Sequence, residues 1–248
     1  MHHFFVKADC IDDFVVTLEG AIVHQIIRVL RLRLGDTIVV LDNSGWENVV
    51  SLETFDDEKI TGKVLDRFYT TGEPKIDVVL YQSLLKFDRF EFILQKGTEL
   101  GVSSFVPVIC ERSVIRNKGD QWFQRRHDRW ERIILEAAEQ SHRGKLPVIH
   151  SPVNFIEATR LANHFTVFPS VKESSINIEI ALKTCGRTGL FNSKVGVFVG
   201  PEGGFTDAEV AHASSSGIVP VTLGRRVLRA ETASIVALTL VLSEFNEL

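Results

Sequence analysis

After residue 72 the chain alternates short, continuous apolar runs with longer segments of helical periodicity. Apolar runs of this length are typical of strands buried on both faces, and strands that alternate with helices form mainly parallel sheets. The predicted strands are 76–81, 105–109, 165–168, 196–199 and 219–223, and the clearest helices are 89–100 and 121–141. Residues 73–248 are therefore predicted to form an α/β domain.

The first 72 residues follow a different pattern. Residues 37–41 and 49–52 are rich in β-branched side chains, and Asp42-Asn43-Ser44-Gly45 between them is a strong hairpin-turn signal. Residues 60–64 continue the pattern. Only 22–32 looks helical, with Ile22, Ile26, Val29 and Leu30 expected on one face. The pattern predicts a small β-barrel or sandwich over residues 1–72, which ends at a polar break around residues 70–74.

Composition excludes several classes of protein. Hydrophobic residues make up 44% and charged residues 24%, which is typical of a soluble globular protein. The longest apolar run, 233–242, is about half the roughly 18–20 residues that a membrane span needs. The N-terminus does not read as a signal peptide. Three distant cysteines define neither a disulfide framework nor a zinc site. We expect a cytoplasmic protein without a membrane partner.

Charge is distributed unevenly although the net charge is only −4. Residues 1–72 hold 7 Lys and Arg against 12 Asp and Glu, yet Arg28, Arg31 and Arg33 fall within six residues. A concentrated basic spot on an acidic domain fits selective contact with a polyanion. A solvated surface cluster is the alternative.

Two unusual loops follow predicted strands, at the edge where parallel sheets bind ligands. The first is Gly200-Pro201-Glu202-Gly203-Gly204-Phe205, after which Thr206-Asp207-Ala208-Glu209 predicts a capped helix start. A strand, a glycine loop and a helix N-terminus together are typical of a nucleotide-type site. The loop is neither G-x-G-x-x-G nor a P-loop, and a tight turn is the alternative.

The second loop, 223–233, carries Arg225, Arg226, Arg229 and Glu231 in front of a very apolar helix, 233–245. A helix that is apolar on most faces must be buried, either in a core or against a second subunit. A charged side chain without a partner is costly next to a buried apolar helix, because it loses contact with water. These side chains are therefore candidates for a functional site. A salt-bridged helix terminus is the alternative.

These two loops closely resemble the signature loops of the RsmE family. Further matching segments occur in order through nearly the whole chain: Phe4-Phe5-Val6, His24 with Arg28-Val29-Leu30-Arg31, Gln95 to Val102, Glu111-Arg112-Ser113-Val114, Arg129-Trp130, and Glu136 to Ser141. One departure is Gly97, where the family usually has alanine. Many motifs in the same order are stronger evidence than any one of them.

The resemblance implies a fold and an activity. RsmE proteins are SPOUT-class enzymes that methylate N3 of a uridine in 16S ribosomal RNA of the small subunit. The implied fold is a PUA-like RNA-binding β-barrel, 1–72, and a SPOUT methyltransferase domain, 73–248, with a C-terminal trefoil knot. The implied partners are the small-subunit RNA or the assembled 30S particle and a second copy of the chain, since SPOUT enzymes generally work as homodimers.

The resemblance also implies site residues. By position, the knot loops that bind S-adenosyl-L-methionine contain Phe168, Pro169, Val199, Gly200, Pro201, Glu202, Gly203, Gly204, Leu223, Gly224, Arg226, Leu228, Thr232 and Ala233. His24, Arg28 and Arg31 are predicted to contact RNA. The eight histidines show no ligand spacing, and the implied chemistry needs no metal.

Methylation of uridine N3 requires alignment of donor and acceptor and removal of the N3 proton. Arg229 is predicted to orient the uracil or to stabilise negative charge on its carbonyl oxygens. Glu231 is predicted either to orient Arg229 or to act as the base. Glu202 and Glu99 are weaker alternatives.

Two other functions are compatible with this pattern. A non-catalytic RNA-binding protein would be expected to have lost its loop glycines, but Gly200, Gly203, Gly204 and Gly224 are all present. A SPOUT enzyme that modifies a ribose 2′-hydroxyl is distinguished only by the position of the new methyl group.

Overall fold

The computed structural model describes residues 1–56, 58–115, 119–170, 176–187 and 193–248, and these residues divide into two compact units. The first contains Met1–Glu73 together with Leu135–Leu146, and the second contains Pro74–Ile134 and Pro147–Leu248. The predicted division at residues 72 and 73 assigns Leu135–Leu146 to the second domain. How function is divided between the two domains stays a prediction.

The first unit contains a five-stranded sheet with the order β1-β3-β4-β5-β2. Its strands are β1 (His3–Phe5), β2 (Val15–Glu19), β3 (Thr37–Leu41), β4 (Trp46–Phe55) and β5 (Lys59–Tyr69). β1 pairs with β3 in parallel, and the other pairs are antiparallel. The β3–β4 hairpin predicted at residues 42–45 is confirmed, since Asn43 and Gly45 both take a positive φ there.

The predicted helix over residues 22–32 is wrong in its geometry and its end. The chain forms a short α-helix, α1 (Ala21–His24), that continues as a π-helix, Gln25–Leu30, and Arg31 then takes a left-handed φ of 55°. A π-helical turn holds more residues than an α-turn, so spacings of three and four no longer keep side chains on one face. Val29 is consequently 64% exposed, whereas Ile26 is buried.

The end of the long helix α3 (Gly119–Gln140) and the residues after it pack within the first unit. Glu139 Oε1 accepts a hydrogen bond from Phe5 N at 3.2 Å, and burial raises the pKa of this carboxyl. Arg143, which is buried, forms a two-bond ion pair with Glu73 at 2.8 and 2.9 Å. The first contact joins residues 134 positions apart, and the second joins residues 70 positions apart.

The second unit is built on an eight-stranded sheet in which all pairs are parallel, which confirms the predicted α/β domain. The order is β11-β13-β10-β12-β6-β7-β8, and β9 also pairs with β7. The strands are β6 (Asp77–Ser83), β7 (Ser104–Ile109), β8 (Val148–Ile149), β9 (Val153–Asn154), β10 (Thr166–Pro169), β11 (Ile176–Asn177), β12 (Lys194–Val199) and β13 (Val219–Thr222).

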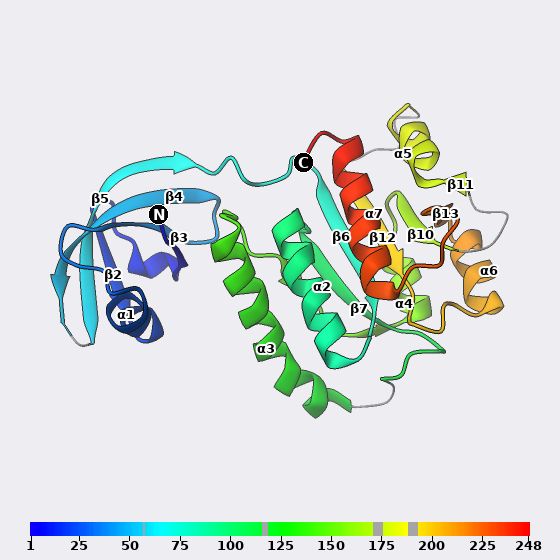
Figure 1. The fold of residues 1–248 in the computed structure, drawn as a ribbon, viewed down its shortest axis with the longest axis horizontal. Coiled ribbons are helices and arrows are strands. Elements are labelled where there is room, and N and C mark those ends of the chain that lie inside the picture. Colours follow the sequence, from blue (N-terminus) through cyan, green and yellow to red (C-terminus); the bar gives the residue numbers. More distant parts are fainter. Residues whose placement is uncertain (57, 116–118, 171–175, 188–192) are drawn as a thin grey trace. The chain divides into compact units, whose positions relative to one another are not determined.

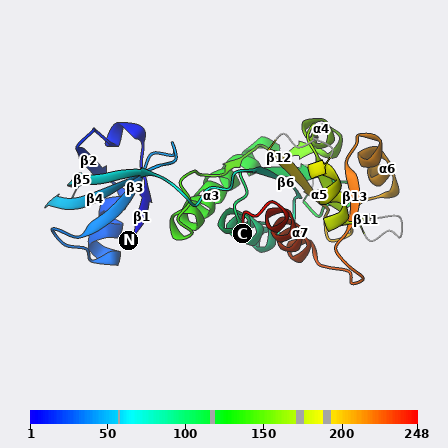
Figure 2. The ribbon, with the colours of Figure 1, turned by 90° about the horizontal axis from the view of Figure 1, so that it is seen from above.

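Helices cover both faces of this sheet (Figures 1 and 2). One core contains side chains of α2 (Phe87–Leu100), α3, α5 (Ile178–Arg187) and α7 (Ala230–Glu244). The opposite core contains side chains of α4 (Phe155–Leu161) and α6 (Asp207–Ser215). Val78 and Leu80 of β6 point to one core and Val79 and Tyr81 to the other, so the middle of this strand is continuously apolar, as expected of a parallel strand covered on both faces.

Gly97 has a packing role. A Cβ at this position of α2 would lie 2.7 Å from the ring of Phe105 on β7, so the absent side chain lets helix and strand approach closely. None of the helices in the described part of the chain combines the length and apolarity that crossing a bilayer would need.

The ring of His164 is enclosed just before β10. It stacks on Tyr81 with ring centroids 6.0 Å apart, and within the described residues neither ring nitrogen has a hydrogen-bond partner. Burial, with a smaller effect of Lys194, lowers the pKa of His164 to about 4. The folded protein therefore holds this imidazole neutral at pH values where an exposed histidine is already protonated.

We expect His164 to make the protein less stable as the pH falls from 6.5 toward 4. In this window the unfolded chain binds a proton at this residue and the folded chain does not, so the free energy of unfolding falls by at most about 1.4 kcal/mol per pH unit. Urea unfolding of wild type and His164→Phe at pH 7 and pH 5 measures the effect. If both proteins lost the same stability between these pH values, the enclosed imidazole would not be the cause.

Candidate active site

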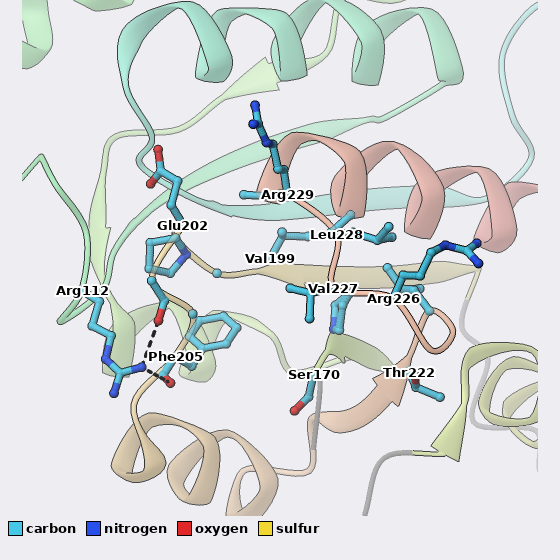
Figure 3. A pocket seen from close by; sticks show the side chains of 18 of the residues that line it. Arg112, Ser170, Val199, Glu202, Phe205, Thr222, Arg226, Val227, Leu228 and Arg229 are labelled. Carbon is cyan, nitrogen blue, oxygen red and sulfur yellow. Dashed lines mark hydrogen bonds between the residues drawn. The ribbon is translucent and has the colours of Figure 1, made fainter. Parts of the chain in front are cut away.

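A cavity of about 610 Å³ lies at the carboxyl ends of β10, β12 and β13 (Figure 3). It is lined by residues 199–205, by residues 222–230 other than Arg225, and by Arg89, Arg112, Pro169, Ser170, Val210 and Ala233. Both loops singled out in the sequence therefore meet at one site, although they lie some twenty residues apart in the chain.

The glycine loop between β12 and α6 forms one wall of the cavity. Gly204 has a φ of +67°, a conformation that side-chain-bearing residues rarely adopt, and its N–H donates to the carbonyl of Pro201 at 2.8 Å. Thr206 then caps α6, and the predicted capping box with Glu209 is present in both directions. A glycine turn and a capped helix start thus follow β12, and the binding of a nucleotide-type ligand there stays a prediction.

Arg112, from the segment that follows β7, forms hydrogen bonds with the glycine loop. Its Nη1 donates to the carbonyl oxygens of Gly203 at 2.9 Å and of Phe205 at 3.3 Å (Figure 3). The neighbouring N–H of Glu111 donates to Glu209 of α6 at 2.8 Å. Sequence reasoning did not assign Arg112 to the site, although the segment Glu111-Arg112-Ser113-Val114 was one of the matching motifs.

The loop between β13 and α7 forms the opposite wall and carries the arginines. Gly224 has a φ of +117°, and its N–H donates to Thr222 Oγ1 at 3.2 Å. Arg226 and Arg229 are both exposed, and their side chains extend toward different sides of the cavity (Figure 3). Arg229 is the residue at the N-cap of α7, which begins three residues earlier than predicted.

Arg89, near the start of α2, also lines the cavity and was not predicted as a site residue. Its Nη1 lies 3.4 Å from Glu202 Oε1, and its Nε lies 4.0 Å from Glu231 Oε1. Four arginines, Arg89, Arg112, Arg226 and Arg229, therefore line the cavity with one carboxylate, Glu202. The charge of the wall favours an anion or a group that becomes negative.

The predicted site residues do not all reach the cavity. Of the predicted cofactor-binding set, Phe168 and Thr232 are absent from the lining. Phe168 is 1% exposed and packs edge-on against Phe205, and Thr232 lies exposed on the first turn of α7. Arg229 lines the cavity, whereas Glu231 does not. The roles of all these residues stay predictions.

The predicted RNA-contacting residues lie in the first unit. His24, Arg28 and Arg31 are all exposed. The predicted helix over residues 22–32 would have included both Arg28 and Arg31, but Arg31 follows the last helical residue. Their common feature is exposure on one short basic segment rather than a shared helix face.

Two buried titratable groups of the second unit, neither of which lines the cavity, are not poised for proton transfer. Burial raises the pKa of the Tyr81 hydroxyl and of the Cys110 thiol, each to about 12. Both therefore stay protonated at neutral pH. One cluster with metal-ligand side chains occurs in the described part of the chain, His127, Asp128 and Glu131 of α3, and none of its members lines the cavity.

Comparison with known proteins identifies the family. Residues 72–242 match the family model described as an RNA methyltransferase domain. The ribosomal RNA small subunit methyltransferase E of Bacillus subtilis (strain 168) is 33% identical, over 90% of this chain and 88% of the relative. The protein of the same name from Synechocystis sp. is 34% identical, over 96% and 76%.

A crystal structure gives the same assignment. The ribosomal RNA small subunit methyltransferase E from Neisseria gonorrhoeae, bound to S-adenosyl methionine, superposes with a TM-score of 0.85 at 29% sequence identity. The superposition covers 98% of this chain and 97% of the other. The chain therefore belongs to the ribosomal RNA small subunit methyltransferase E family of RNA methyltransferases.

Proposed function

We propose that the protein transfers a methyl group from S-adenosyl-L-methionine to N3 of a specific uridine in 16S ribosomal RNA of the small subunit. The observation that carries the proposal is that the glycine loop and the arginine-bearing loop line opposite walls of the same cavity. The solved relative from Neisseria gonorrhoeae supports the choice of cofactor, and the names of the curated relatives support the RNA.

The cavity residues fit this cofactor. A volume of about 610 Å³ is within the range of small-molecule sites, roughly 300–1,000 Å³. Gly203 and Gly204 let the ligand approach the backbone, and Val199, Leu223 and Leu228 offer apolar contacts. When bound, S-adenosyl-L-methionine supplies an electrophilic methyl group.

The chain's own residues have the remaining tasks. The proton on N3 must pass to a base, and its loss places negative charge on N3 and the uracil oxygens, which the new bond from N3 to the methyl group then neutralises. Arg229 faces that charge from the cavity wall. Glu231 is either the base or the residue that orients an arginine.

The finer features of the fold belong to the same proposal. We propose that residues 1–72 act as a PUA-like RNA-binding barrel and that residues 73–248 act as a SPOUT domain. A trefoil knot is supported by the path of the chain, because β10 lies between β13 and β12, and α7 then packs back against β12, α2 and α5. The apolar side chains of α7 that stay only half-buried in one copy of the chain, Ile235, Val236 and Leu240, support a homodimer that would bury them further. We propose that this dimer works in the cytoplasm.

RNA affinity is expected to depend on Arg28 and Arg31. Replacing both with glutamate should weaken binding to 16S RNA and reduce the slope of log affinity against log salt by about two phosphate contacts. Binding of S-adenosyl-L-methionine, measured by calorimetry, should not change. If the salt dependence is unaltered, Arg28 and Arg31 do not contact phosphates and form only a solvated surface cluster.

The position of the new methyl group tests the function directly. Purified protein is incubated with methyl-labelled cofactor and with small subunits or 16S RNA from a strain that lacks the enzyme, and the nucleosides are separated by mass. We expect 3-methyluridine. Label in ribose would identify a 2′-hydroxyl methyltransferase instead, and absence of both cofactor binding and product would identify a non-catalytic RNA-binding protein.

A further inference from the structure

We propose that Arg89 is a second catalytic arginine of the methyl-transfer site, held by Glu202 and Glu231, which contacts the uracil and stabilises its developing negative charge together with Arg229. This inference rests on the proposed function. It also assigns Glu231 a role: of the two roles that the sequence left open, the geometry favours orientation, and the arginine that Glu231 orients is Arg89.

The first argument is the position of the Arg89 guanidinium and the Glu231 carboxylate relative to the cavity. Arg89 lines the cavity and Glu231 does not, so Arg89 is the member of the pair that can reach a bound base. The Arg89 side chain is 34% exposed and that of Glu231 18% exposed. Within the described residues, Glu231 Oε2 is enclosed without a hydrogen-bond partner, which leaves Oε1, facing Arg89, as the oxygen in an ion pair.

The second argument is that the guanidinium of Arg89 lies between two carboxylates, 3.4 Å from Glu202 and 4.0 Å from Glu231, the second distance being that of an ion pair and not of a hydrogen bond. Nη1 faces Glu202 of the glycine loop, and Nε faces Glu231 on the first turn of α7. An arginine has five N–H donors in a rigid fork, so two carboxylates can fix its plane and leave other donors for a ligand. Such fixed donors stabilise charge in a transition state without having to reorganise.

The third argument is electrostatic. Three segments meet at this point, the start of α2, the glycine loop and the start of α7. The described lining holds four arginines and one glutamate, so the cavity wall keeps an excess of positive charge even with Glu202 paired. When N3 loses its proton, both flanking carbonyl oxygens of the uracil gain negative charge, and two arginines suit two oxygens.

The test compares Arg89→Ala with a matched control on a contact that lies outside the cavity. Arg129 forms a two-bond ion pair with Glu91 of α2, at 2.6 and 2.7 Å, and does not line the cavity. Methyl transfer is measured in a single turnover on small subunits with both substrates saturating. We expect Arg89→Ala to lower the rate by about 100-fold and Arg129→Ala to leave it unchanged. Added methylguanidinium should restore part of the rate of Arg89→Ala and should not change the rate of Arg129→Ala.

The role of Glu231 is tested by combining variants. If Glu231 acts by orienting Arg89, Glu231→Gln should slow wild type but have little further effect in Arg89→Ala. Arg89→Lys, which keeps the charge but not the two-sided hold, should fall between wild type and Arg89→Ala.

Several outcomes would overturn the proposal. They are a rate for Arg89→Ala within a few-fold of wild type, equal losses in Arg89→Ala and Arg129→Ala, no rescue by methylguanidinium, or additive losses with Glu231→Gln. A loss confined to cofactor or RNA affinity would also overturn it, because Arg89 would then be a binding residue only. These outcomes concern the rate of methyl transfer or the affinity of the variants, whereas the proposed function is contradicted by the identity of the methylated atom, so the two failures are distinguishable.

Discussion

Replacement of Arg229 with alanine is expected to lower the rate of methyl transfer by about 100- to 1,000-fold and to leave the affinity for S-adenosyl-L-methionine close to that of wild type. Arg229 lines the cavity at the N-cap of α7, and within the described residues its guanidinium has no ion pair. A cation without a carboxylate partner is available to the substrate. Its effect should appear mainly as charge develops on the uracil, because that is when the interaction strengthens.

Arg225 is the matched control for this prediction. It lies on the same loop and is exposed, but it does not line the cavity. Single-turnover rates and calorimetry on Arg229→Ala and Arg225→Ala separate loss of chemistry from loss of general positive charge. If both variants lost the same rate, or if Arg229→Ala lost cofactor affinity instead, Arg229 would not stabilise the transition state.

The architecture of the second unit was predictable because parallel strands covered on both faces carry an unmistakable apolar pattern. β6, β7, β10, β12 and β13 all lie where continuous apolar runs had been identified. Strand ends of a parallel sheet share one edge, so two loops identified separately could be expected near one another. The strands β1 and β2, by contrast, were not predicted.

Arg89 and Arg112 were missed for a physical reason. Each reaches the cavity from an element more than 90 positions away from its partners, Glu202 and Gly203, and no local spacing records such a contact. The same limit applies to Glu231, for which the neighbouring Arg229 was the expected partner. The ion pair observed in the structure is with Arg89 on a different helix.

The π-helix was missed because the apolar spacing of residues 22–32 suits an α-helix. The exposed Val29 and the left-handed conformation of Arg31 show that the helix instead widens into a π-helix and ends at Leu30. Periodicity predicts which face a regular helix would bury, but a change of hydrogen-bond register depends on how the segment packs. The candidate RNA-contacting arginines lie on this irregular segment, and their arrangement could not be read from spacing.

Replacement of Gly204 with valine is expected to abolish measurable binding of S-adenosyl-L-methionine while the protein stays folded. A β-branched residue is strongly disfavoured at the φ of +67° that Gly204 adopts. The loop should therefore leave this conformation and lose the turn in which Gly204 N donates to Pro201. The cavity wall on the side of the glycine loop would then be rearranged, and calorimetry should show no measurable binding.

Gly217 provides a control with the same backbone strain at a different place. Its φ is +82°, a Cβ there would meet nothing within 4 Å, and it lies between α6 and β13 away from the cavity lining. Gly217→Val should therefore lower the thermal midpoint of unfolding about as much as Gly204→Val but keep cofactor affinity. Because the strain is matched, only the location of the glycine differs between the two variants. Equal loss of affinity in both would mean that general destabilisation, not the glycine loop, controls binding.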